Sequence, residues 1–166
     1  MYAAEPGACP LILGLGNPIL GDDRIGLEVA RALHARLPPG AAALCEAELG
    51  GMELMDRLEG WRKVALIDAL EPGALEPGAL VELELDDLAT RYAPLTPHNA
   101  GLCHCLELGM RLGMQMPDDL VVFAIGVQDP YTFSEQLTAP LAQALPGLVE
   151  EIFERLFGPV GRWGCQ

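Results

Sequence analysis

Two carboxylates and one imidazole stand out because each is expected at the edge of a structural element. Asp23, with the neighbouring Asp22, follows an apolar segment that ends in glycines. Asp68 closes a second apolar segment, and His98 directly precedes a predicted helix. In a parallel α/β sheet, ligands bind beyond the carboxyl ends of the strands. Two carboxylates and an imidazole suit a borderline divalent metal such as nickel, zinc or cobalt and leave positions open for another ligand. The alternative is that these side chains only begin or end their own elements.

Other common catalytic arrangements are disfavoured by the residues available. The single serine, Ser134, lies in Phe-Ser-Glu rather than in a nucleophile elbow, which disfavours a serine hydrolase. The run Cys-His-Cys at 103–105 lies in a predicted helix, where neighbouring side chains point about 100° apart and cannot converge on one zinc ion. The glycine loop at 14–21 has Ile19 where a dinucleotide fingerprint needs its third glycine, and two acids follow where pyrophosphate would sit.

Apolar patterning predicts strands that alternate with helices. Residues 11–16 form a short apolar run that ends in glycines, which is typical of a buried strand. Residues 22–37 repeat apolar positions every four residues, with acids at the start and an arginine near the end, as the helix dipole favours. This alternation predicts an α/β protein, a three-layer α/β/α sandwich around a mostly parallel sheet. Further strands are predicted at 41–45, 63–68, 79–85 and 120–127, and helices at 51–58, 100–113 and 135–157, the last interrupted at Pro140 and Pro146.

The chain length fits one domain. Its 166 residues match the usual size of a single domain, which we place at 1–158. The glycine-rich residues 159–166 are expected to form a loosely held tail. The unit Leu-Glu-Pro-Gly-Ala occurs twice in succession over residues 70–79, which indicates a duplicated surface loop because two copies are too few for a solenoid.

Charge and composition restrict the partners. The chain has 24 acidic residues against 10 Lys and Arg, a formal net charge of -14. This charge argues against nucleic acid and against anionic membranes, which need cationic side chains to neutralise phosphates. The apolar runs are far shorter than the about 20 residues that span a bilayer, and residues 1–5 do not resemble a signal peptide. Five cysteines without a C-x-x-C pair agree with a reducing compartment, so a cytoplasmic location is expected.

Four segments of the chain resemble one known family. Residues 14–26 read Gly-Leu-Gly-Asn-Pro-Ile-Leu-Gly-Asp-Asp-Arg-Ile-Gly, which closely resembles the opening motif of the hydrogenase maturation endopeptidases. Those proteins remove a C-terminal extension from the large subunit of a nickel-iron hydrogenase once nickel is installed. The resemblance continues in the family's order through Gly51-Met-Glu-Leu-Met55, Ile67-Asp-Ala69 and Pro97-His-Asn-Ala-Gly-Leu102.

The resemblance implies a five-stranded twisted sheet flanked by helices and a site of three metal-contacting side chains. The second acid of the opening motif is Asp23, the strand-end aspartate is Asp68, and the histidine of the Pro-His segment is His98. These three are therefore the expected catalytic and nickel-contacting residues. The implied partner is a hydrogenase large-subunit precursor, which itself supplies the nickel, so the isolated protein is expected to be a metal-free monomer. Asp22 is a candidate for a supporting or water-activating role, or simply an acid at a helix start.

One departure and two alternative functions accompany the resemblance. Family members usually carry an Asp-Gly-Gly/Cys-Thr-x-Gly motif before Met-Glu-Leu, whereas residues 46–51 read Glu-Ala-Glu-Leu-Gly-Gly, so no role passes to Glu46 or Leu49. A first alternative is an assembly chaperone that binds the precursor without cutting it. A second is a peptidyl-tRNA hydrolase, which shares the phrases Gly-Leu-Gly-Asn-Pro and His-Asn-Ala-Gly. In that family the two phrases lie close together, whereas here most of the domain separates them, and a charge of -14 suits tRNA poorly.

Overall fold

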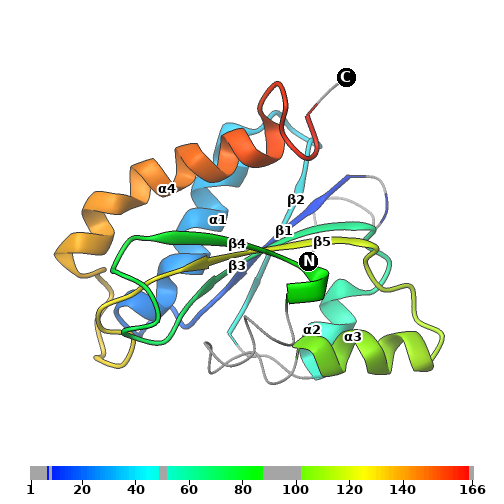
Figure 1. The fold of residues 1–166 in the computed structure, drawn as a ribbon, viewed down its shortest axis with the longest axis horizontal. Helices are drawn as coiled ribbons and strands as arrows, with labels where there is room; N and C mark the ends of the chain where they lie inside the picture. The colour runs from blue at the N-terminus through cyan, green and yellow to red at the C-terminus, as the bar shows by residue number, and fades with distance from the viewer. Residues whose placement is uncertain (1–6, 8, 49–51, 88–101, 165–166) are drawn as a thin grey trace.

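The computed structural model describes residues 7, 9–48, 52–87 and 102–164 of the chain. Strands and helices alternate along it, as the apolar patterning predicts, except that β4 follows β3 with no helix between them (Figure 1). The strands are β1 (Leu11–Leu15), β2 (Ala43–Ala47), β3 (Lys63–Ala69), β4 (Leu80–Glu84) and β5 (Asp119–Ile125). The helices are α1 (Ile25–Arg36), α2 (Met52–Leu58), α3 (Leu102–Arg111) and α4 (Ala139–Phe157), with 3-10 turns at Asp22–Arg24 and Leu85–Asp87.

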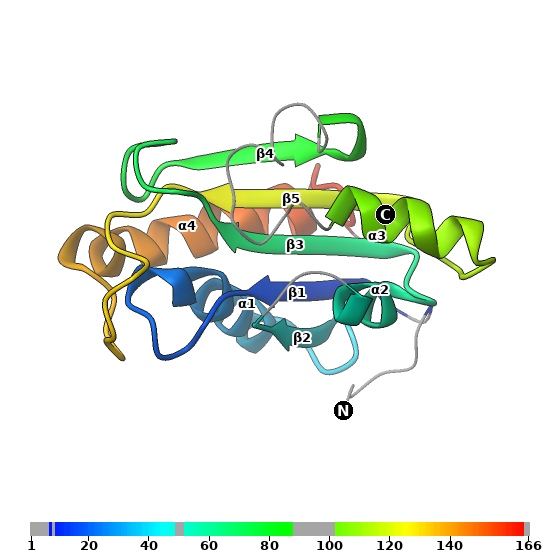
Figure 2. The ribbon, with the colours of Figure 1, turned by 90° about the horizontal axis from the view of Figure 1, so that it is seen from below.

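The strands form one mostly parallel sheet in the order β2-β1-β3-β5-β4, and the predicted α/β class is confirmed. β1, β3 and β5 are parallel, and they lie in the middle of the sheet in Figure 2. Their residues are almost all buried, as expected for strands covered on both faces. β4 pairs antiparallel with β5 at one edge, where its alternating acids remain partly exposed.

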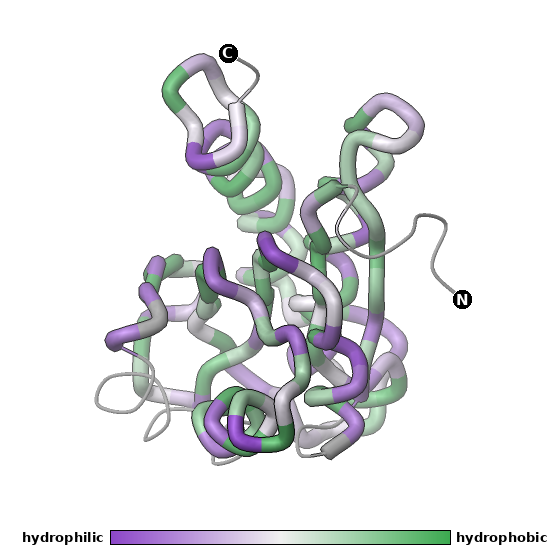
Figure 3. The backbone as a smooth tube through the Cα atoms, turned by 90° about the vertical axis from the view of Figure 1, so that its right-hand side faces the viewer, coloured by the Kyte–Doolittle hydropathy of each residue, from purple (hydrophilic) through white to green (hydrophobic). Residues whose placement is uncertain are grey.

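Helices cover both faces of the sheet and give the expected three layers. α1 and α4 lie on one face, and α2 and α3 lie on the other (Figure 1). Each face has its own apolar cluster: Leu13, Leu66 and Val122 belong to the α2/α3 side, whereas Ile12, Ile67 and Phe123 belong to the α1/α4 side. Hydrophobic and hydrophilic residues are interspersed along the outer helices in Figure 3, and α4 buries one row of apolar side chains against the sheet. No helix among the described residues is long and apolar enough to cross a membrane.

Two predicted helices differ from the structure at their starts. Residues 22–24 form a 3-10 turn, and the α-helix begins only at Ile25. α4 begins at Ala139 rather than at residue 135, with Pro140 in its first turn, where a proline loses no hydrogen bond. The predicted interruption at Pro146 is wrong, because α4 continues through it. Pro146 is exposed, and the buried residues on both sides of it, Leu141 and Leu148, hold the helix to the sheet.

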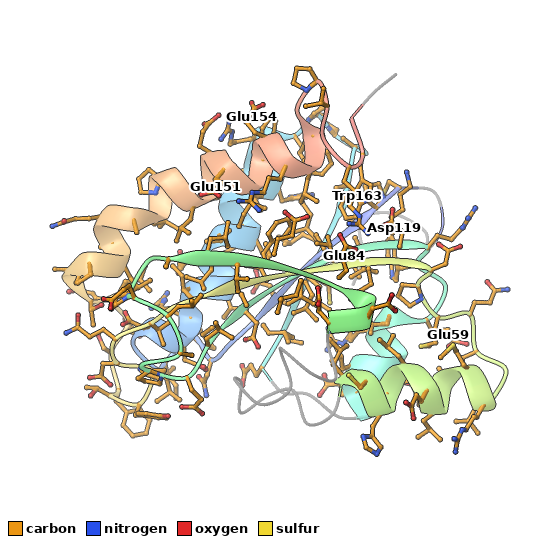
Figure 4. The ribbon with its side chains drawn as sticks, viewed as in Figure 1. Glu59, Glu84, Asp119, Glu151, Glu154 and Trp163 are labelled. Carbon is orange, nitrogen blue, oxygen red and sulfur yellow. The ribbon has the colours of Figure 1, made fainter. Side chains whose placement is uncertain are left out.

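The C-terminal residues pack against the edge of the sheet. Arg162 bonds both carboxylate oxygens of Glu84 and, at 2.6 Å, one oxygen of Asp119. The Trp163 indole N–H donates to the other Asp119 oxygen at 2.9 Å, and its ring meets Phe157 edge-on. Trp163, Asp119 and Glu84 lie close together in Figure 4. Arg162 and Trp163 therefore bond the segment that the sequence predicts to be loosely held to the sheet.

Candidate active site

Glycines bring the start of α1 onto the carboxyl ends of β1 and β3. A β-carbon on Gly26 would lie 2.3 Å from the Leu15 carbonyl oxygen and 2.5 Å from that of Ile67. A β-carbon on Gly16, whose φ is +141°, would lie 2.0 Å from the carbonyl oxygen of Asp23. Both distances are far below van der Waals contact, so only glycine allows these backbones to approach so closely. The glycine motif therefore fixes the turn that carries the two acids at the strand ends.

Asp23 is one of the three predicted site residues, and the structure places it at the predicted edge of the sheet. Its side chain is buried, and its carboxylate oxygen Oδ2 accepts the backbone N–H of Asn17 at 2.8 Å. This bond from a backbone amide fixes the direction of the carboxylate. Asp23 also lines a cavity at this end of the sheet. Its carboxylate is therefore largely shielded from solvent but borders the space inside that cavity.

Asp68 lies at the neighbouring strand end, as predicted. It is the residue before the last in β3, it is fully buried, and its Oδ1 accepts the backbone N–H of Ala69 at 2.9 Å. The two residues that follow it, Ala69 and Leu70, line the same cavity as Asp23. Since β1 and β3 are adjacent parallel strands, their carboxyl ends bring Asp23 and Asp68 to one edge of the sheet.

A cavity of about 190 Å³ opens at this edge of the sheet. Three of its side chains are polar: Asp23, Glu71 and Tyr131. The Tyr131 hydroxyl donates a hydrogen bond to the Glu71 carboxylate. This bond, helped by the charges of Glu71 and Asp23, raises the pKa of the Tyr131 phenol. The other walls are apolar and comprise Leu20, Ala69, Leu70 and Pro130.

Asp22 is adjacent to Asp23 in the chain but has a different set of contacts. It is fully buried, and its Oδ2 accepts the backbone N–H groups of Gln128 and Asp129 at 3.0 and 2.9 Å. The same carboxylate accepts the backbone N–H of Thr138 at 2.7 Å and the Thr138 hydroxyl at 2.9 Å. Asp22 therefore joins the loop after β5 to the start of α4. Its side chain makes no capping bond to its own helical turn.

The predicted histidine, His98, lies outside the described residues, as do Pro97, Asn99, Ala100 and Gly101 of its motif. Among the residues that the structure describes, no three His, Cys, Asp or Glu side chains form a group that could hold a metal ion. The Cys-His-Cys run at 103–105 lies in α3, where His104 is exposed and Cys105 is buried. These side chains do not converge, as their positions on a helix predict.

Sequence reasoning missed two side chains of this site. Glu71 is the first acid after β3, and Tyr131 lies in the loop after β5, so a search for polar residues after each strand would have included both. Glu46, at the departure from the family pattern, makes a two-pronged ion pair with Arg31, both bonds measuring 2.7 Å. Its side chain therefore contacts α1, and residues 49–51 of that departure lie outside the described part of the chain.

Comparisons with known proteins agree on one family. Residues 27–155 match the family model of the hydrogenase maturation proteases. The Escherichia coli hydrogenase 2 maturation protease is 26% identical over 117 residues, which cover 69% of this chain and 71% of that protein. A Methanocaldococcus jannaschii protein, provisionally named a hydrogenase maturation protease, is 30% identical over 86% of this chain and 85% of its own length. The solved structure of the Escherichia coli hydrogenase-maturating endopeptidase HybD has the same fold, with a TM-score of 0.73 at 23% identity over 86% of this chain and 88% of that one.

Proposed function

Because the chain belongs to the hydrogenase maturation protease family, we propose that it is an endopeptidase that removes the C-terminal extension of a nickel-iron hydrogenase large-subunit precursor after nickel insertion. Nickel is part of the substrate in this proposal, because it arrives bound to the precursor. Asp23, Asp68 and His98 are the residues that contact it. The protein itself needs no resident metal, and it acts as a monomer in the cytoplasm.

The observation that carries the proposal is the pair of buried carboxylates at adjacent strand ends. Burying an ionised carboxylate costs several kcal/mol unless hydrogen bonds or opposite charge compensate for it. Asp23 and Asp68 each receive a backbone N–H bond, and Asp23 lies in a cavity wall that also carries Glu71. A site with this much negative charge favours a cation, and an arriving nickel ion would supply one.

The proposed mechanism uses nickel as a check on the substrate. A precursor without nickel offers nothing for the two carboxylates and His98 to bind, so its scissile bond is not positioned. When the loaded precursor docks, Asn17 and Ala69 hold Asp23 and Asp68 in fixed directions through their backbone N–H groups. The bound metal or the carboxylates then orient a water molecule or polarise the scissile carbonyl. Carboxylates that are fixed in this way need little reorganisation when the substrate binds.

The test is a processing assay read by intact mass. The substrate is a purified nickel-iron hydrogenase large-subunit precursor, prepared with and without nickel. We expect loss of a C-terminal peptide only from the loaded precursor, and loss of this activity in the His98→Ala variant. The matched control is His104→Ala, because His104 is exposed on α3 and has no part in the proposed site. Normal processing by His98→Ala would contradict the site assignment.

The same assay separates the alternatives. A chaperone that does not cut would bind the loaded precursor and leave its mass unchanged. A peptidyl-tRNA hydrolase would release the tRNA from a peptidyl-tRNA and leave the precursor intact. Cleavage that is equal with and without nickel would keep the peptidase and refute the metal check.

A further inference from the structure

Two loops pair with each other beside the cavity that holds Asp23. Leu20, in the loop after β1, faces Phe133, in the loop after β5, in an antiparallel bridge. The Gly21 N–H donates to the Thr132 carbonyl at 2.9 Å, and the Ser134 N–H donates to the Ile19 carbonyl at 3.1 Å. Both loops lie at the end of the sheet to which the arrowheads of β1, β3 and β5 point in Figure 2. We refer to residues 19–21 and 131–134 as the paired loops.

The paired loops expose an apolar surface. Ile19, Tyr131 and Phe133 are 51%, 63% and 79% exposed, and large apolar side chains are seldom gathered in this way on a surface that has no partner. The surface adjoins the cavity, because Tyr131 belongs to both. A ligand that lies on the paired loops is therefore next to Asp23.

The outer edge of residues 132–134 offers backbone hydrogen bonds. The Thr132 carbonyl and the Ser134 N–H point toward residues 19–21, so the N–H and carbonyl of Phe133, between them, point the opposite way. Within the described part of the chain, these two Phe133 groups bond to no other residue. An exposed strand edge of this kind can accept another extended chain.

Hydrogen bonds to the side chains of Asp22 and Asp129 hold the paired loops in place. Asp22 accepts the N–H groups of Gln128 and Asp129, at the start of the loop. The Asp129 side chain in turn accepts the backbone N–H groups of Tyr131 and Thr132, at 3.1 Å each, and the Thr132 hydroxyl at 2.6 Å. A surface fixed before binding pays less conformational entropy when a ligand arrives.

We propose that the paired loops bind the segment of the precursor next to its scissile bond as an added extended strand. The inference rests on the proposed function and names the way in which the substrate is held. The Phe133 N–H and carbonyl bond the backbone of that segment, while the Phe133 side chain contacts an apolar side chain in it. The partner is an extended chain rather than a helix, because only an extended chain leaves its backbone groups free for an edge. Asp23 and Glu71 nearby disfavour acidic residues in the segment.

Photo-crosslinking tests the placement directly. Phe133 is replaced by benzoylphenylalanine, the loaded precursor is added, and the crosslinked residue is located by mass spectrometry. The control places the same photoreactive residue at Leu112, which is 62% exposed just after α3, on the opposite face from α1 and α4. We expect crosslinks from position 133 to the residues around the cleavage site and none there from position 112. Crosslinks from 133 only to the folded body of the precursor, or none at all, would overturn the proposal.

Kinetics and a backbone-modified peptide separate edge pairing from simple apolar contact. Phe133→Ser is expected to raise KM for the loaded precursor about tenfold with little change in kcat, and Leu112→Ser to change neither. A synthetic peptide that spans the cleavage site should inhibit processing by the wild type and reduce crosslinking of the precursor to benzoylphenylalanine at position 133. Methylation of its backbone nitrogens should abolish both effects, and equal potency of the methylated peptide would refute the added strand. If the wild-type protein leaves every precursor uncut, the proposed function fails, while the crosslink still decides whether this surface binds the segment.

Discussion

The carboxylate of Asp22 bonds both the backbone N–H and the hydroxyl of Thr138, a residue 116 positions further along the chain. This contact connects the turn after β1 to the first turn of α4. Since the same carboxylate also holds the loop after β5, one buried acid fixes three segments around the candidate active site. The adjacent Asp23 instead faces the cavity. Neighbouring aspartates thus have separate tasks, which leads to opposite predictions for their variants.

Asp22→Ala is expected to destabilise the protein by about 3 kcal/mol, because its backbone donors would remain buried without an acceptor. The free energy of unfolding from urea denaturation measures the effect. Asp56→Ala, at an exposed position in α2, is a control that should stay within about 0.5 kcal/mol of the wild type. A comparable loss in both variants would show that the Asp22 contacts contribute nothing specific.

Asp23→Asn is expected to abolish processing while the fold is retained. The amide oxygen can still accept the Asn17 N–H, so the turn keeps its hydrogen bond. The lost charge should lower the rate of precursor processing by about 100-fold or more. Mutation of a residue that only bonds to a metal ligand typically lowers metal affinity or activity by about 10- to 100-fold, and Asp23 is proposed to contact the metal itself. Intact-mass kinetics and the unfolding midpoint are measured on the same sample. Wild-type processing by Asp23→Asn would remove Asp23 from the site.

Gly16→Ala should cost about 3 kcal/mol or more, because its β-carbon would overlap the Asp23 carbonyl oxygen and its φ of +141° is unfavourable for alanine. Gly40→Ala provides the matched control. Gly40 has a φ of +82° but nothing within 4 Å of a new β-carbon, so only the backbone strain of about 1–2 kcal/mol remains. Equal losses in the two variants would mean that the close approach to Asp23 has no energetic importance.

Trp163→Ala should lower the free energy of unfolding by about 2 kcal/mol, through the lost bond to Asp119 and the lost contact with Phe157. Val160→Ala, in the same segment but 99% exposed, should change it by less than about 0.5 kcal/mol. Thermal unfolding of both variants tests whether residues 158–164 stabilise the sheet edge. An unchanged Trp163→Ala variant would favour the loosely held tail that the sequence predicts.

The bond between Tyr131 and Glu71 predicts a pH effect. The pKa of the phenol is raised in the folded protein, chiefly by the hydrogen bond to Glu71. The folded state therefore holds this proton more tightly than the unfolded state, so the contribution to stability is full below the unfolded pKa of about 10 and is lost as pH rises through the folded pKa. Glu71→Gln should lower the pKa of Tyr131. Phenolate absorbance measures the pKa of Tyr131, and the Tyr131→Phe variant gives the contribution of the other tyrosines. A pKa that is unchanged in Glu71→Gln would show that the hydrogen bond to Glu71 does not raise it.

Much of the fold could be predicted because burial leaves a strong pattern. The buried strands β1, β3 and β5 are nearly continuous apolar runs, and each was located within one or two residues of its bounds. Helix boundaries were less certain. The acids at 22 and 23 fit a helix start in sequence, but residues 22–24 form a 3-10 turn in which Asp22 bonds to the loop after β5. Pro146 was predicted to interrupt α4, whereas burial of the residues around it against the sheet outweighs the lost hydrogen bond.

By itself, the sequence determined the α/β class, the glycine turn, and the placement of Asp23 and Asp68 at strand ends. These features follow from the spacing of apolar residues and the positions of glycines, which can be read from short stretches of the chain. The spacing of the residues could not separate Asp22 from Asp23, and only the resemblance to a known family pointed to Asp23 as the site residue. The tertiary structure alone shows which groups Asp22 contacts, because the N–H donors that bind it come from more than 100 residues away. The same reason applies to Glu71, Tyr131 and Phe133. Their positions after strands mark Glu71 and Tyr131 as candidates, but only the packing of the loops after different strands brings these residues together.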